Sequence, residues 1–204
     1  MKFLQWKSLT ITSLFCLLPI LPGVLLWDAL PETMAIHFNI YGVPDGFASK
    51  GFVVFALPAL MVVLQMICCA ITDFNVHKHG DRKKFVTVTK WIIPCLCFVL
   101  QLLTFGYALG WNVDIRKSVA LIVGAIFLVM GNYLPKFDYI KNYDLDTEKA
   151  RKINRFIGYE TVIMGFLFCL SVFFPPISTI VCLLLLLPYA GIAVVYSIIT
   201  ARKK

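Results

Sequence analysis

Charged residues are scarce in this chain, and acidic residues are the scarcest. Of its 204 residues, 15% are Asp, Glu, Lys or Arg and only 11 are acidic, whereas 60% are hydrophobic. Soluble domains contain about 45–50% apolar residues, so this composition excludes an ordinary soluble protein and indicates an integral membrane protein. The net charge of +8 does not indicate nucleic acid, because the basic residues follow the loops between apolar runs. We expect membrane lipid as a partner and no direct nucleic-acid binding.

Motifs that carry chemistry are also missing. The sequence contains no P-loop, no nucleophile elbow, no HExxH helix and no CxxC pair. All seven cysteines lie inside apolar runs, which argues against a disulfide framework or a zinc site. His77 and His79 flank Lys78, whose charge would repel a metal cation. We expect no catalytic residue, no metal and no cofactor, and an intramembrane enzyme is a minority interpretation.

Six apolar runs are each long enough to cross a bilayer, which takes about 20 residues in a helix. The sequence therefore predicts an all-α integral membrane protein with a single membrane domain, 1–204. The first run lacks a small-residue cleavage site, so we interpret it as a span that Pro19 and Pro22 bend. The predicted spans are 8–27, 52–71, 91–111, 118–134, 156–174 and 177–199, with an extracytoplasmic cap at 28–51 and cytoplasmic loops at 72–90 and 135–155.

The distribution of Lys and Arg predicts the orientation. Sixteen of the 19 lie in the segments 1–7, 72–90, 135–155 and 200–204, and the other three lie in the alternate loops. Because basic loops stay on the cytoplasmic side, we expect both termini in the cytoplasm of a bacterial cell membrane. Within 135–155, acids precede bases, which favours a helix from about Asp146.

The cap contains the only long polar segment on the predicted outer side. Apolar and polar residues alternate in it, which is typical of a short strand. The apolar members are Ile36, Phe38 and Ile40, and the polar members are His37, Asn39 and Tyr41. Turn chemistry follows, because Pro44 fixes φ, Asp45 can bond its own backbone and Gly46 tolerates a positive φ.

Two interpretations of the cap remain open. In one it is a structural plug over the helix ends, with His37 bonded to the turn. In the other it is a receptor surface whose polar residues and apolar face bind a partner. Phe47 and Lys50 are expected at the membrane surface in both.

Polar residues inside the spans are few. Gln65 and Gln101 are expected to bond across helices. Glu160 lies about a turn inside the fifth span, where it is expected to pair with Lys152 or Arg155 or, alternatively, to form a functional polar site. These three residues would carry a small transporter or channel, which is the main alternative function. Gly106 and Gly110 form a GxxxG motif that favours close approach of another helix.

Two ordered motifs resemble the SdpI family of bacterial membrane immunity proteins. The first is LP…HFN..G.PDG…K, from Leu30 to Lys50, and the second is GN.LPK. The second supplies the landmark residues Gly131, Asn132, Pro135 and Lys136. After Lys136 the chain departs from the family, since a GIRTPW-type block is absent and Ala150 and Asn154 stand where the family has Trp and His.

The resemblance implies that the chain protects a cell against a secreted peptide toxin with antimicrobial activity. It also implies a signalling role, in which the toxin-occupied protein sequesters a cytoplasmic transcriptional repressor. A protein of the same fold without the immunity role remains an alternative. The residues expected to bind the toxin are His37, Phe38, Asn39, Tyr41, Pro44, Asp45, Gly46 and Lys50.

Overall fold

The computed structural model describes residues 4–79, 83–136 and 147–202. In these ranges six helical segments are long and apolar enough to cross a membrane, which confirms the predicted all-α membrane fold. They are Trp6–Leu25, Phe52–Phe74, Phe85–Ala108, Ile115–Lys136, Glu148–Ser171 and Ile177–Arg202. The chain divides into two compact units. The prediction of one membrane domain stays a prediction.

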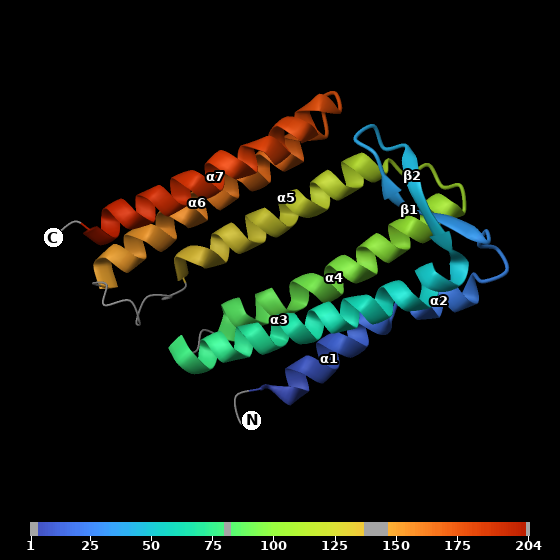
Figure 1. Cartoon of the computed structure of the whole chain (residues 1–204), viewed down its shortest axis with the longest axis horizontal. Helices are drawn as coiled ribbons and strands as arrows, with labels where there is room; N and C mark the ends of the chain where they lie inside the picture. The colour runs from blue at the N-terminus through green and yellow to red at the C-terminus, as the bar shows by residue number, and fades with distance from the viewer. Residues whose placement is uncertain (1–3, 80–82, 137–146, 203–204) are drawn as a thin grey trace. The chain divides into compact units, whose positions relative to one another are not determined.

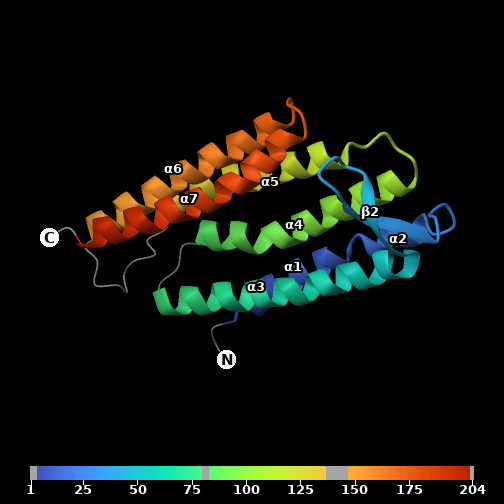
Figure 2. The same ribbon diagram turned by 45° about the horizontal axis from the view of Figure 1, so that its top comes forward.

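Unit 1 comprises Met1–Lys78 and Val86–Ser118. Its helices α1 (Trp6–Leu17), α3 (Leu57–His79) and α4 (Lys83–Ala108) lie side by side (Figures 1 and 2). The first span is interrupted after Leu17 and resumes as α2 (Ile20–Leu25). The break falls at Pro19, as the sequence predicts.

A β-hairpin lies at the end of unit 1 where α2 and the carboxyl end of α4 meet (Figure 1). Strand β1 (Thr33–Phe38) pairs antiparallel with β2 (Pro44–Ser49). Its inner side joins an apolar cluster of Leu30, Met34, Val53, Val54 and Phe105. The cap is therefore an ordered hairpin that packs on the helices of its own unit.

The chain enters α3 through one turn of π-helix, η1 (Phe52–Ala56). The Leu57 amide bonds Phe52 O, and Pro58 has no amide hydrogen to offer Val53 O. The side-chain Nε2 of Gln101 donates to Val53 O instead, at 2.6 Å. The predicted interhelical role of Gln101 is confirmed, and its reason is a carbonyl that the helix itself leaves unpaired.

Helix α4 ends in a glycine cap. Gly110 has a φ of +76°, its amide bonds Tyr107 O at 3.0 Å, and the Trp111 amide bonds Gly106 O at 2.9 Å, the pattern of a Schellman motif. A Cβ on Gly106 would lie 2.7 Å from the Trp111 ring. The predicted approach of another helix at the GxxxG motif is therefore wrong, since Gly110 ends α4 and Gly106 makes room for Trp111 within unit 1.

Much of the range 72–90, expected to be a loop, is helical, because α3 continues to His79 and α4 begins at Lys83. A helix end can contain charged residues when those that are buried have a partner of opposite charge. The loop expected at 135–155 is described only in part. Residues 137–146 lie outside the described residues, and α6 begins at Thr147.

Unit 2 comprises His79–Phe85 and Val119–Lys204. It holds most of α5 (Ile115–Tyr133), the 3₁₀ turn η2 (Leu134–Lys136), α6 (Thr147–Ser171) and α7 (Ile177–Arg202). Helices α6 and α7 pack against each other over their length (Figures 1 and 2). An apolar cluster of Met164, Phe168 and Cys182 lies between them.

Two pairs of glycines bring α5 and α6 together. A Cβ on Gly131 would lie 2.8 Å from Gly158 O, and one on Gly124 would lie 2.9 Å from Gly165 O. The two glycines of each helix are seven residues apart, so they repeat on one face over two turns. Gly131, the first of the landmark residues, therefore belongs to a backbone-to-backbone helix contact.

Candidate functional site

The hairpin of the cap is held by a contact between His37 and Asp45. His37 Nδ1 lies 2.5 Å from Asp45 Oδ1, on neighbouring strands. A Cβ on Gly46 would lie 2.8 Å from the Cβ of His37. Asp45 and Gly46 therefore act together, since one holds the imidazole and the other leaves space for its strand to approach.

The turn of the hairpin lies earlier than the sequence predicts. Asn39 Oδ1 accepts bonds from the amides of Tyr41 at 2.9 Å and Val43 at 3.1 Å. The residue with positive φ is Gly42, at +79°, and Pro44, Asp45 and Gly46 belong to β2. The turn prediction for 43–46 was wrong because it took strong turn formers in sequence and ignored the Asx bonds that Asn39 makes.

The predicted alternation of faces also fails. The buried residues of β1 are Met34 and Ala35, whereas Ile36 and Ile40 are 41% and 47% exposed. Irregularities in the strand pairing between Ala35 and Phe38 shift the register, and a bulge places consecutive residues on the same side. The exposed residues form what we call the cap surface, composed of Ile36, His37, Ile40, Tyr41, Val43, Asp45 and Phe47.

Lys50 does not point to lipid headgroups. It is 6% exposed, and its Nζ donates to Trp27 O at 3.1 Å and Leu30 O at 3.2 Å. The ammonium also lies 2.9 Å from Glu32 Oε1 and 4.7 Å from the centre of the Trp27 ring. Lys50 ties the chain before the hairpin to the chain after it.

Phe38 and the segment after α4 fix the hairpin on unit 1. The Phe38 ring meets the Tyr107 ring edge-on at 4.9 Å, and a Cβ placed on Gly42 would lie 3.6 Å from the Cβ of Arg116. Burial alone would raise the pKa of Asp114, but the amide and ammonium of Lys117 lower it below its ordinary value. Asp114 is therefore the residue that caps the amino end of α5, next to the hairpin.

The opposite end of unit 1 contains a buried ion pair that the sequence reasoning missed. Lys90 Nζ lies 2.5 Å from Asp73 Oδ1, and the two side chains are 1% and 0% exposed. The backbone amide of Gln5 donates to Asp73 Oδ2 at 3.0 Å. Both residues lie in the range 72–90, which the sequence predicts as a cytoplasmic loop. The available signal was the i, i+4, i+8 spacing of Gln65, Cys69 and Asp73, which places polar groups on one face of α3.

Gln65 continues this network toward the middle of the bundle. Its Nε2 donates to Thr12 Oγ1 and to Lys90 O, both at 2.8 Å. It therefore joins α1, α3 and α4, which confirms the predicted interhelical bonding. Gln65 Oε1 is buried and has no partner within the part of the chain that the structure describes.

The remaining predicted residues lie in unit 2. Lys136 Nζ bonds Asn132 Oδ1 at 3.4 Å and lies 5.1 Å from the Tyr133 ring centre. Pro135 packs against Gly158. The pairing expected for Glu160 is not found, because Lys152 binds Glu148 at 2.8 Å and Glu160 Oε2 is buried without a partner among the described residues.

These features coincide with similarities to known proteins. Residues 14–62, which include the whole cap, match a family described as a domain of unknown function, DUF1648. The chain is also 26% identical over 175 residues to the immunity protein SdpI of Bacillus subtilis (strain 168), covering 82% of this chain and 83% of the relative. The chain is SdpI-like. Because it has six helices long and apolar enough to cross a membrane, the chain is a multi-pass membrane protein. No solved structure matches it.

Proposed function

We propose that this chain is a membrane immunity protein and that its cap surface binds a secreted peptide toxin. The observation that carries the proposal is an exposed apolar and aromatic surface on a hairpin whose shape is fixed. Tyr41, Val43 and Phe47 are 69%, 55% and 58% exposed, and an ordered surface binds with a smaller entropy cost than a mobile loop. The similarity to an immunity protein supports a role in protection rather than catalysis.

The individual residues have separate roles in this proposal. Tyr41, Phe47 and the His37–Asp45 pair contact the toxin, the imidazole and carboxylate giving the apolar surface a polar centre. Asn39, Gly46 and Lys50 maintain the hairpin, and Phe38 anchors it on Tyr107. This division separates variants that unfold the cap from variants that change only its surface.

A survival assay tests the proposal. The parent and a Tyr41→Ala, Phe47→Ala variant are expressed in a peptide-sensitive bacterial host and exposed to a panel of secreted antimicrobial peptides. The expected result is protection by the parent and loss of protection by the variant at equal membrane abundance. The matched control is Phe173→Ala, since Phe173 is 83% exposed and follows α6 on the same predicted side of the membrane.

Two results would count against the proposal. If the parent protects against no peptide, the immunity role fails. If the parent and the double variant protect equally well, the cap is a structural plug and the toxin binds elsewhere.

The proposal extends to orientation and signalling. Both termini lie in the cytoplasm. The concentration of Lys and Arg in alternate segments supports this orientation. A reporter fused to the carboxyl terminus that works only in the cytoplasm tests it. The toxin-occupied chain further captures a cytoplasmic transcriptional repressor, as the resemblance implies. A repressor that stays off the membrane when toxin is added would remove this second role.

A transporter or channel is the second candidate, favoured by the buried network of Asp73, Lys90 and Gln65. Ionisable groups inside a membrane protein often mark an ion path. This candidate predicts solute or proton flux in proteoliposomes that a Gln65→Leu variant lacks and the cap variant retains. Absence of flux in the parent would reject it.

A further inference from the structure

Helix α7 presents most of its surface outward from unit 2. Cys182 is its one buried residue within the range the structure describes, although the helix has 26 residues. Leu184 and Leu187 are 61% and 75% exposed. In a membrane span such a surface faces lipid or another protein.

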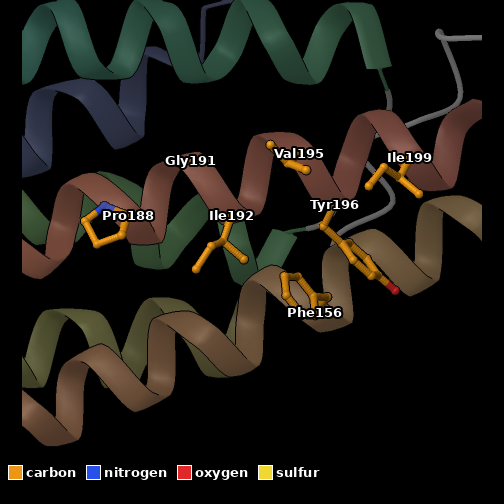
Figure 3. Close-up of a pocket in the computed structure, with 7 residues that line it drawn as sticks. All are labelled: Phe156, Pro188, Gly191, Ile192, Val195, Tyr196 and Ile199. Atoms are coloured by element: carbon orange, nitrogen blue, oxygen red, sulfur yellow. The ribbon is translucent and has the colours of Figure 1, made fainter.

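This surface is hollowed by a groove of about 470 Å³ that residues of α7 line together with Phe156 of α6. Figure 3 shows Ile192 and Tyr196 of α7 pointing toward Phe156 of α6. The Phe156 and Tyr196 rings stack at 3.9 Å. Gly191 leaves the groove open, because a Cβ placed there meets nothing within 4 Å.

The groove leads to a cation. One stripe of α7 contains four residues at steps of three, four and three, which are Ile192, Val195, Ile199 and Arg202. Arg202 is exposed in the last turn of the helix. On α6, Lys152 lies one turn before Phe156, and the acid beside it, Glu148, is already paired with it at 2.8 Å. Arg202 therefore lies three residues beyond Ile199, the last residue of α7 that lines the groove, and it is the basic residue on that stripe, whereas the charge of Lys152 is balanced by Glu148.

We propose that this groove binds an acyl chain of an anionic phospholipid whose phosphate contacts Arg202. The lining of the groove is apolar and its stripe on α7 continues to the cation of Arg202, which matches a lipid tail joined to a negative headgroup. The site lies within unit 2 and does not depend on the proposed immunity role.

A second copy of this chain fits the same surface less well. A dimer in a membrane has its two-fold axis along the membrane normal, so equivalent residues meet at the same depth. Packing through this stripe would bring the two Arg202 side chains near each other. An anionic lipid brings the opposite charge to the same place.

Lipid-dependent thermal stability of the purified chain tests the site. The chain is measured in mixed micelles with phosphatidylglycerol, with phosphatidylcholine of the same acyl chains, or with glycerol 3-phosphate alone. We expect stabilisation by phosphatidylglycerol above that by phosphatidylcholine, and none by glycerol 3-phosphate. Arg202→Gln should weaken phosphatidylglycerol binding about fivefold, the effect of one basic residue at a membrane surface.

Gly191→Leu should abolish the difference between the lipids by filling the groove. Its matched control is Ala190→Leu, since Ala190 is exposed on α7 but does not line the groove. Lys7→Gln, an equal loss of charge in unit 1, should leave the lipid difference unchanged. Because Gly→Leu also raises helix propensity, the readout is the difference between lipids and not the melting temperature itself.

Three results would overturn the proposal. The parent shows no preference for phosphatidylglycerol, or glycerol 3-phosphate alone reproduces the stabilisation, or Gly191→Leu retains the preference while changing the oligomeric state. The last result would identify the stripe as an interface between copies.

Discussion

The two ends of unit 1 each bury a lysine, and they do so in different ways. At the cap, Lys50 binds two backbone carbonyls, an aromatic ring and Glu32, whose side chain is 89% exposed. At the other end, Lys90 binds Asp73, and both side chains are buried. A charge that keeps contact with water through its partner tolerates loss of that partner, whereas a fully buried pair does not. The hairpin end should therefore be the more adaptable end.

Removal of the buried acid should have the largest effect. Asp73→Leu leaves Lys90 charged without its carboxylate and should lower the stability of the fold by about 3–5 kcal/mol. Unfolding by SDS in mixed micelles measures the loss. The double variant Asp73→Leu, Lys90→Met should recover most of it, and a double variant as unstable as the single one would show that the charge pair is not the cause.

Replacement of the other lysine should cost less. Lys50→Met leaves the Trp27 and Leu30 carbonyls without their donor, at about 2 kcal/mol in total. The same unfolding assay measures it, with protease cleavage near Gly42 as a local readout. A loss equal to that of Asp73→Leu would contradict the proposed difference between the ends.

Close packing inside the hairpin gives a smaller effect again. Gly46→Ala places a Cβ 2.8 Å from the His37 Cβ and should cost about 1 kcal/mol by forcing the strands apart. Gly51→Ala is the matched control, because a Cβ there meets nothing within 4 Å. Equal stability of the two variants would show that the strands relax freely.

The smallest effect is expected for Glu32→Gln. The carboxylate is mostly in water, and exposed ion pairs contribute about 0–1 kcal/mol. Unfolding in low and high salt should give nearly the same result as for the parent. A large loss would mean that Lys50 depends on Glu32 as Lys90 depends on Asp73.

The sequence predicts the spans of this protein better than it predicts the partners of its charges. Hydropathy identifies six apolar helices because each must fill a bilayer by itself. The same reasoning assigns Lys50 to the membrane surface and Lys90 to a cytoplasmic loop, since it treats each charge alone. Their burial depends on Trp27 and Asp73, which lie 23 and 17 residues away. Pairing over such distances is a property of the packed bundle.

The hairpin shows the same limit on a shorter scale. Its motif residues indicate an ordered cap, but the roles of Asp45 and Gly46 are set by His37 on the opposite strand. Periodicity cannot locate a bulge, and one extra residue reverses the expected faces. The exposed position of Phe47 follows from the register, which no single segment determines.

The turn of the hairpin is closed by the side-chain oxygen of Asn39, which accepts bonds from two backbone amides, and by Gly42, whose φ is positive. Ile40, Tyr41 and Val43 take no part in those bonds with their side chains. The tip can therefore accumulate substitutions without loss of folding, provided that the asparagine and glycine remain. The chemistry of the tip is therefore set by three side chains on a constant frame, and changing it leaves the fold intact.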